Sequence, residues 1–360
     1  MRRVAKRTIL DVKPYIPGKP IDEVKRELGL KDVIKLASNE NPYGPSPKVF
    51  QAIKTAAKEI HRYPDGGCFY LRQALVRHLK VSPEQLIFGN GSDELIVLAI
   101  RAFVEEGDEV IIAKPSFLIY DIASQIAGAK IKSIPLIDFY YDLKAMKAAV
   151  TEKTKIIFLG NPDNPAGTYL TQAQVEDFLK DLRSDILIFL DEAYFEYVHA
   201  KDYVKSTGLI NRYKNVFVSR TFSKMYGLAG LRVGYGIGSP EVVDLLNRIR
   251  EPFNVNSLAQ TAALTALADQ SYYKKLARMV EVERKSLYKE FKRLKLSYIQ
   301  SCTNFILIEV NDSTTVAQQL LKRGIIIRDM SHWGLTKYIR VTIGTQKENR
   351  RLIKALEEIL

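Results

Sequence analysis

Four short, largely apolar runs in the middle of the chain restrict its fold more than any other feature of the sequence. They cover residues 109–113, 155–160, 185–191 and 215–219. Continuous apolar strands are typical of a parallel sheet covered on both faces, because every side chain then meets a protein layer. A sheet with one solvated face would instead alternate apolar and polar residues.

Helical patterns lie between these apolar runs. The segment 69–80 carries leucines at every fourth position on one face. A helix that follows the run at 155–160 begins with Thr171 and Gln174, which have the spacing of a capping box. Strands that alternate with helices in this way predict an α/β fold, a large doubly wound domain with a mainly parallel sheet.

The pattern changes near residue 255, where we expect a domain boundary. Residues 256–360 combine a largely helical stretch with three short strand-like runs, which predicts a smaller α+β domain. Residues 1–35 are interrupted by prolines and a glycine, so we expect an N-terminal arm that packs with this small domain. The large domain would then span residues 36–255.

The composition excludes several classes of protein. Of 360 residues, 46% are hydrophobic and 26% are charged, which is ordinary for a globular protein and excludes a disordered chain. No apolar run reaches the roughly 18 residues of a membrane span, and the basic N-terminus lacks the apolar core of a signal peptide. Cys68 and Cys302 are too few for a disulfide framework, which favours a cytoplasmic location. The four histidines share no metal-ligand spacing, so no metal is expected.

The chain is basic. Lys and Arg number 54 against 41 Asp and Glu, which gives a formal net charge of +13. The basic residues are spread along the whole chain without a basic tail, so the pattern disfavours nucleic acid as a partner. A positive field of this kind also suits small anionic ligands such as phosphates and carboxylates.

The segment 219–235 contains a single lysine, Lys224, among small and hydroxyl residues just beyond the last apolar run. A lysine that loses its proton through burial or neighbouring cations can form an imine with a carbonyl compound. Thr221, Ser223 and Arg232 lie around it, and hydroxyls with a guanidinium can hold a phosphate. Taken alone, this segment is more simply explained as a solvated loop.

Two further strand ends change that interpretation. Asp191 ends the run at 185–191 and Tyr194 follows it, while Asn164 lies just beyond the run at 155–160. The carboxyl ends of strands are where open α/β sheets bind ligands. A lysine, a carboxylate, a phenol, an amide and a phosphate cradle together suit pyridoxal phosphate.

A glycine-rich turn between a strand-like segment and a helix offers a phosphate site. Gly89 and Gly91 begin the pattern of a dinucleotide-binding loop, but Glu94 stands where its third glycine would be. The dinucleotide interpretation therefore fails. The remaining turn could still receive a phosphate on the backbone N–H groups of the following helix.

With these motifs in place, the chain resembles the histidinol-phosphate aminotransferases, which are fold-type I pyridoxal-phosphate enzymes. The resemblance spans nearly the full length, and its motifs are KPYIPGKP, LASNENPYGPSP, YPDGGCFYLRQAL, GNGSDE, KPSFLIY, NPDNPAGT, DEAY, SKMYGLAGLRVGY, IIIRDM and YIRVTIGT. The chain departs mildly from the family pattern at Asp163, Ala166, Met225, Tyr226, His332 and Trp333.

The resemblance implies roles around the cofactor ring. Lys224 would bind the cofactor as an imine and then move a proton during catalysis. Asp191 would pair with the pyridinium nitrogen and keep it protonated. Tyr194 and Asn164 would bond the phenolate oxygen, and Phe117 would stack on the ring.

The resemblance also implies how phosphate and substrate are held. The cofactor phosphate would be surrounded by Ser92, Asp93, Thr221, Ser223 and Arg232. Tyr63 would reach that phosphate from the other subunit, which implies a homodimer with composite active sites. Arg340, with Arg328, would hold the acidic end of the substrate, and Asn39 and Tyr15 would line the mouth of the site.

The implied activity is transamination of histidinol phosphate with 2-oxoglutarate, which gives imidazole acetol phosphate and glutamate in histidine biosynthesis. An aromatic amino-acid aminotransferase on the same scaffold is the nearest alternative. A threonine-phosphate decarboxylase and a non-enzymatic basic nucleic-acid binder are less favoured. The sequence does not show which groups line the amino-donor pocket, so the donor stays open.

Overall fold

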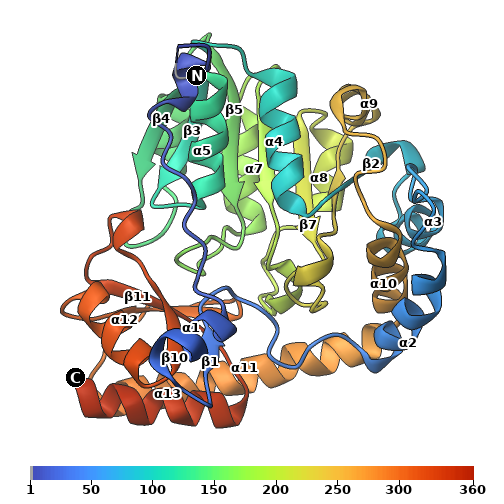
Figure 1. Cartoon of the computed structure of the whole chain (residues 1–360). Coiled ribbons are helices and arrows are strands. Elements are labelled where there is room, and N and C mark those ends of the chain that lie inside the picture. The colour runs from blue at the N-terminus through green and yellow to red at the C-terminus, as the bar shows by residue number, and fades with distance from the viewer. Residues whose placement is uncertain (1–2) are drawn as a thin grey trace.

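The computed structural model of the chain describes residues 3–360 and contains a large and a small sheet (Figure 1). The strands of the large sheet are β2 (Leu86–Gly89), β3 (Glu109–Lys114), β4 (Lys130–Pro135), β5 (Thr154–Gly160), β6 (Leu187–Asp191), β7 (Val216–Thr221) and β8 (Gly234–Ile237). Their order is β2-β8-β7-β6-β5-β3-β4, and all neighbours are parallel except those of β8. The predicted doubly wound, mainly parallel sheet is confirmed.

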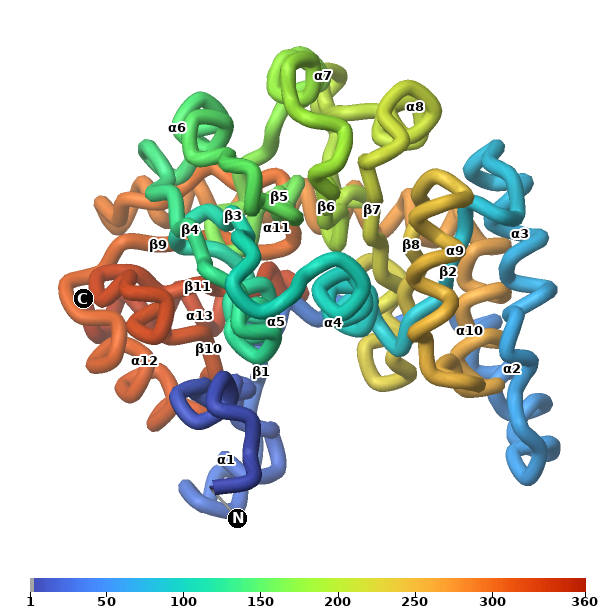
Figure 2. The backbone as a smooth tube through the Cα atoms, turned by 90° about the horizontal axis from the view of Figure 1, so that it is seen from above, coloured from blue at the N-terminus to red at the C-terminus, as the bar shows by residue number. Residues whose placement is uncertain are grey.

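Helices cover both faces of the large sheet (Figure 2). One face carries α4 (Ser92–Phe103), α5 (Leu118–Ala127) and α9 (Pro240–Ile249), and the other carries α6 (Leu143–Ala148), α7 (Gln172–Lys180) and α8 (Ser206–Arg212). Residues of β5 and β6 are almost all buried, as their apolar runs require. Thr171 forms the expected capping box with Gln174 at the start of α7.

The small sheet has the order β1-β10-β11-β9. Its strands are β1 (Ile34–Leu36), β9 (Phe305–Glu309), β10 (Ile325–Asp329) and β11 (Tyr338–Thr342), and its helices are α11 (Gln270–Arg293), α12 (Ser313–Lys322) and α13 (Gln346–Ile359). Strand β1 pairs parallel with β10, whereas β10, β11 and β9 pair antiparallel. The smaller unit thus combines helices with a mixed sheet, as in the α+β domain that the sequence predicts.

The remaining elements are all helical. They are α1 (Ile21–Leu28), α2 (Pro47–Ala56), α3 (Phe69–Leu79), α10 (Ser257–Ala268) and the short 3-10 helices η1 (Arg7–Ile9), η2 (Ala57–Glu59), η3 (Pro83–Gln85), η4 (Phe195–Tyr197), η5 (Ala229–Leu231) and η6 (Ser331–Trp333). Helix α10 packs against α2 and α3, although it follows the boundary that we expect near residue 255.

The N-terminal arm contacts both units. Val24 of α1 packs with Val33 and Ile326, and β1 pairs with β10 of the small sheet. Its first turn, η1, instead lies on α5 of the large unit, where the Thr8 hydroxyl donates a hydrogen bond to the Ile126 carbonyl at 3.0 Å. The arm therefore runs across the front of the molecule from one unit to the other (Figure 1).

The sheet register brings the predicted strand ends together. Gly160 at the end of β5 is the partner of Asp191 at the end of β6, and Asp191 is the partner of Ser219 near the end of β7. These carboxyl ends face the small sheet. Within residues 3–360, no helix combines the length and the apolar character that crossing a membrane requires.

Candidate active site

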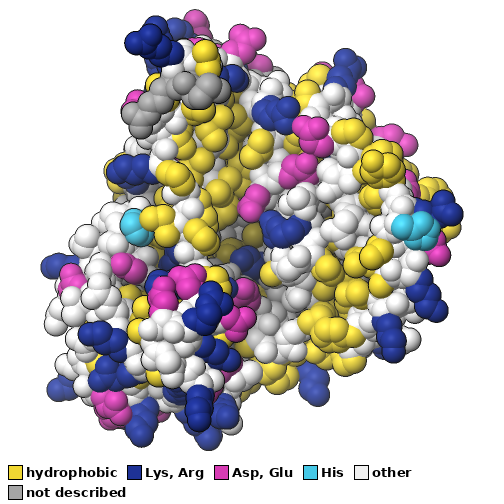
Figure 3. Space-filling model, in the orientation of Figure 1, with side chains coloured by type: hydrophobic (Ala, Val, Ile, Leu, Met, Phe, Trp, Pro, Cys, Tyr) yellow, Lys and Arg dark blue, Asp and Glu magenta, His cyan; other side chains and the backbone are white. Residues whose placement is uncertain are grey.

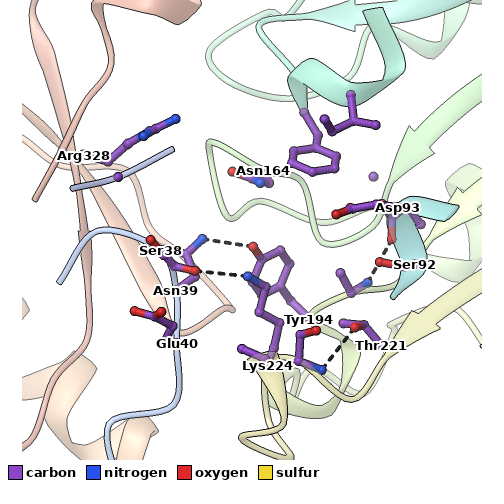
Figure 4. Close-up of a pocket in the computed structure, with 18 of the residues that line it drawn as sticks. Ser38, Asn39, Glu40, Ser92, Asp93, Asn164, Tyr194, Thr221, Lys224 and Arg328 are labelled. Carbon is purple, nitrogen blue, oxygen red and sulfur yellow. Dashed lines mark hydrogen bonds between the residues drawn. The ribbon is translucent and has the colours of Figure 1, made fainter. Parts of the chain in front are cut away.

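A cavity of about 350 Å³ lies between the strand ends of the large sheet and the small sheet (Figure 4). It is lined by fourteen of the fifteen residues that the sequence indicated: Tyr15, Asn39, Ser92, Asp93, Phe117, Asn164, Asp191, Tyr194, Thr221, Ser223, Lys224, Arg232, Arg328 and Arg340. Tyr63 is not among the lining residues. It is 84% exposed and stacks on Phe253 at a ring-centroid distance of 4.9 Å.

Lys224 lies in the loop that follows β7 and points into the cavity. Its Nζ donates a hydrogen bond to the Ser38 carbonyl at 3.1 Å and lies 5.6 Å from the centre of the Tyr194 ring (Figure 4). The amine therefore sits among neutral acceptors and an aromatic face. It is placed to react with a carbonyl group bound in the cavity.

Asp191 is 6% exposed and accepts three hydrogen bonds at the end of β6. The Tyr120 hydroxyl donates to Oδ2 at 2.7 Å, and the Ser219 hydroxyl and the Ala193 N–H donate to Oδ1 at 3.0 and 3.2 Å. Burial raises the pKa of Asp191 from 3.8 to about 6, and these hydrogen bonds oppose the rise. Among residues 3–360, Asp191 takes part in no ion pair.

The N-terminus of α4 faces Arg232 across one end of the cavity. The Arg232 guanidinium donates to the Ser223 hydroxyl at 3.2 Å and to the Asp93 carboxylate at 3.3 Å. Arg232 itself has a left-handed backbone with φ of 57°, which is uncommon outside glycine and is found at functional sites. Gly91 precedes α4 with φ of 83°, and a Cβ there would collide with the Arg232 guanidinium. This end is a cradle for an anion.

Arg340, on β11, lies at the opposite end of the cavity and is only 5% exposed. Its guanidinium donates to the Asn164 side-chain oxygen and, at 3.1 Å, to the Ala37 carbonyl, while Nε has no partner among the described residues. Burial, together with the nearby Arg328, lowers the pKa of Arg340. The guanidinium thus has unused donors and no carboxylate to neutralise it within residues 3–360.

Arg328 on β10 is likewise a buried arginine that donates to a backbone carbonyl. It is 8% exposed, donates to the Ile16 carbonyl at 2.7 Å, and lies over the rings of Tyr15 and Trp333 at 5.4 and 4.8 Å. Its Nε also lacks a partner in the described part of the chain. The arm therefore contributes Tyr15, Pro17 and Gly18 to this end of the cavity.

Tyr194 and Asn39 form the wall between the two ends. The Asn39 side-chain amide donates to the Tyr194 hydroxyl at 2.9 Å (Figure 4). Asn39 is fixed in turn by Thr342, which accepts a hydrogen bond from its backbone N–H at 2.9 Å. The small sheet thereby helps to place a phenol that comes from the large one.

Two residues that contact Asp191 are not among those that the sequence indicated. Tyr120 lines the cavity, and Ser219 lies on β7 next to Asp191 in the sheet. A signal for both is present in the sequence. Tyr120 follows Phe117 by three residues, which is one helical turn, and Ser219 precedes Thr221 by two residues, which puts both on one face of a strand.

The sequence shows no pattern of metal ligands, but side chains that are far apart in the chain can still meet in space to hold a metal ion. Among residues 3–360, no group of three His, Cys, Asp or Glu side chains is arranged to hold a metal ion. The cavity instead presents the Lys224 amine, the buried carboxylate of Asp191, and arginines at both ends. This arrangement suits an anionic organic molecule with a reactive carbonyl.

Comparison with known proteins supplies the family. The sequence profile described as "Aminotransferase class I and II" matches residues 31–356. The chain belongs to the class I and II aminotransferases. A histidinol-phosphate aminotransferase of Moorella thermoacetica is 49% identical over 98% of this chain and 92% of the relative, and one of Methylobacillus flagellatus is 46% identical over 97% and 95%.

A solved aminotransferase structure supports the same assignment. The crystal structure of a histidinol-phosphate aminotransferase from Sinorhizobium meliloti in complex with pyridoxal-5'-phosphate matches with a TM-score of 0.89 at 30% identity. The match covers 99% of this chain and 98% of that one. The predicted fold-type I aminotransferase architecture is therefore confirmed.

Proposed function

We propose that this aminotransferase uses pyridoxal 5'-phosphate to transfer the amino group of histidinol phosphate to 2-oxoglutarate. When bound, the cofactor supplies an aldehyde that links to amines and a ring that draws electrons from the carbon losing its proton. The cavity fits this group at both ends: Gly91 leaves room for Arg232 beside the start of α4, and Asp191 is a buried carboxylate without a cation among the described residues.

The observation that carries the substrate proposal is the pair of buried arginines, Arg328 and Arg340. A buried charge without a partner is costly, yet two of them line the same cavity and keep free donors. A phosphate on the amino donor, or a carboxylate on 2-oxoglutarate, would neutralise them with paired hydrogen bonds. The same two residues would thus serve both substrates.

Each half-reaction then depends on residues with distinct tasks. Lys224 would hold the cofactor through its amine and, when that amine is free, would move the proton at the substrate Cα. Asp191 would keep the cofactor nitrogen protonated, and Tyr194 and Asn164 would bond the ring oxygen. Phe117 would cover one face of the ring, and the arm residue Tyr15 would shield the substrate from water.

A panel of amino donors tests the substrate. Histidinol phosphate, tyrosine, phenylalanine and threonine phosphate are each supplied with 2-oxoglutarate, and glutamate formation is measured. We expect kcat/KM for histidinol phosphate to exceed the values for tyrosine and phenylalanine by at least about tenfold, because a phosphate offers two arginines more charge and more acceptor oxygens than one carboxylate does. A preference for tyrosine or phenylalanine would instead identify an aromatic amino-acid aminotransferase. Carbon dioxide release from threonine phosphate would identify a decarboxylase.

We further propose that two copies of the chain form a homodimer in the cytoplasm. Apolar side chains gather on the edge formed by α2, α3 and the segment before α10 (Figure 3), and the exposed ones there are Phe50, Ile60, Tyr63, Phe69, Tyr70 and Phe253. Exposed apolar patches of this kind mark protein interfaces. Tyr63, which lies outside its own cavity, would reach the cofactor phosphate of the partner.

Subunit mixing tests this composite site. Tyr63→Ala and Lys224→Ala are each expected to be nearly inactive as homodimers. In a mixed dimer, one site receives Lys224 from the first variant and Tyr63 from the second, so up to about one quarter of wild-type activity should return in an equal mixture. Absence of recovery, when mass measurement shows that subunits exchange, would mean that Tyr63 does not act across the interface.

A further inference from the structure

The carboxylate of Asp191 is held by a residue that the sequence did not indicate. Tyr120 donates its hydroxyl to Oδ2 at 2.7 Å, the shortest of the three hydrogen bonds to this carboxylate. The two other donors, Ser219 and Ala193, both approach Oδ1. Tyr120 is therefore the residue that fixes the second oxygen and, with it, the plane of the carboxylate.

The Tyr120 ring is itself tightly fixed. It stacks on Phe158 of β5 with a centroid distance of 4.6 Å and an angle of 9° between the ring planes. It meets Phe117 edge-to-face at 5.6 Å and 85°. Tyr120 is 2% exposed, and aromatic contacts of this geometry restrict ring orientation.

Tyr120 thus contacts two residues with separate expected tasks. Phe117 would cover the face of the cofactor ring, and Asp191 would meet its nitrogen. We propose that Tyr120 is a positioning residue that orients Asp191 for the cofactor nitrogen and ties it to Phe117. This inference rests on the proposed use of pyridoxal phosphate.

The chemistry of the hydroxyl supports this role. Burial and the Asp191 charge raise the pKa of Tyr120 well above its usual value of 10, so the phenol keeps its proton and remains a donor. A donor to Oδ2 stabilises the ionised carboxylate. An ionised, oriented Asp191 is the form that a protonated ring nitrogen would require.

The test is the affinity of the cofactor-free protein for pyridoxal phosphate, measured by equilibrium dialysis. Tyr120→Phe removes the hydroxyl and keeps the ring on Phe158 and Phe117. A hydrogen bond to a charged group has a net value that corresponds to roughly tenfold or more in affinity, so Kd should rise about tenfold. Tyr197→Phe is the matched control, because the buried Tyr197 hydroxyl has no partner among the described residues. Its Kd should stay within about twofold of the wild-type value.

A double-variant cycle separates positioning from general packing. In an Asp191→Asn background, Tyr120→Phe should change Kd by no more than about twofold, because the group on which it acts is gone. An unchanged Kd in Tyr120→Phe alone, or an equal loss in both backgrounds, would overturn the role of Tyr120. An equal loss in Tyr197→Phe would overturn it as well.

These outcomes are distinct from failure of the proposed function. If the wild-type protein does not bind pyridoxal phosphate, both the proposed function and this inference fall. If the wild type binds it and Tyr120→Phe binds it equally well, only the inference falls.

Discussion

Two neighbouring carboxylates at the end of β6, Asp191 and Glu192, have different partners. Both are buried, but they meet opposite faces of the sheet: Asp191, the last residue of β6, contacts Tyr120 of α5, whereas Glu192 just after it contacts Ser206 of α8. Glu192 forms an ion pair with Arg220 at 2.8 Å and accepts a hydrogen bond from the Ser206 hydroxyl at 2.9 Å. Asp191 receives only hydroxyl and backbone donors and has no cation among the described residues.

The difference indicates which carboxylate is structural and which is reserved for a ligand. Arg220 also lies over the Phe195 ring at 3.6 Å, and Glu192 keeps the pKa of this guanidinium above its ordinary value. That pair is complete without any ligand. Asp191 is held in place but left uncompensated, so its charge is satisfied only when a cation such as a pyridinium enters the cavity.

The largest effect is expected on the structural side. Glu192→Gln removes the charge that compensates Arg220 and leaves a buried guanidinium unpaired. Breaking a buried pair in this way costs about 3–5 kcal/mol, so the free energy of unfolding should fall by that amount. Urea unfolding of the cofactor-free protein measures it. A loss below about 1 kcal/mol would mean that the pair is not structural.

Asp191→Asn should have the opposite effect on the cofactor-free protein. The pKa of Asp191 is raised from 3.8 to about 6 in the fold, so folding favours its protonated form. The stabilisation that the protonated carboxyl group of Asp191 gives to the folded state is fully present below about pH 4 and is lost as the pH rises through about 6. Removing the charge should therefore stabilise the cofactor-free protein at pH 8 by about 1–3 kcal/mol.

The gain in stability should accompany a loss of function. Without the carboxylate, kcat should fall on the order of 10²-fold or more, as for the loss of one preorganised electrostatic contact. Unfolding of both proteins at pH 4 and pH 8, with steady-state kinetics, gives the comparison. A variant that is less stable at pH 8 and within twofold of wild-type activity would remove the distinction between the two carboxylates.

Much of this arrangement follows from local sequence. The apolar runs predict β5, β6 and β7, and parallel strands end at the same edge of a sheet, so Asn164, Asp191 and Thr221 had to lie close together. Strand β4 gave no such signal, because it is a partly exposed edge strand with alternating polarity. Strand β8 also lacks such a signal, because it is short and contains two glycines.

The partners of the two carboxylates could not be identified in the same way. Arg220 pairs with Glu192 across 28 positions, and Tyr120 bonds Asp191 across 71. Such pairs depend on how strands and helices are registered in space, which residue spacing alone does not fix. The path of the arm is similar: its first turn meets α5 through Thr8, a contact that no periodicity in the arm predicts.

The most direct test of the central claim concerns Lys224. The protein loaded with pyridoxal phosphate should show a visible absorbance band, and borohydride should reduce the imine and fix the cofactor on a lysine. Peptide mass mapping identifies that lysine. We expect the label on the peptide that contains Lys224, and no cofactor fixed to protein by borohydride in Lys224→Ala. A label on another lysine, or unchanged turnover by Lys224→Ala, would contradict this account of the active site.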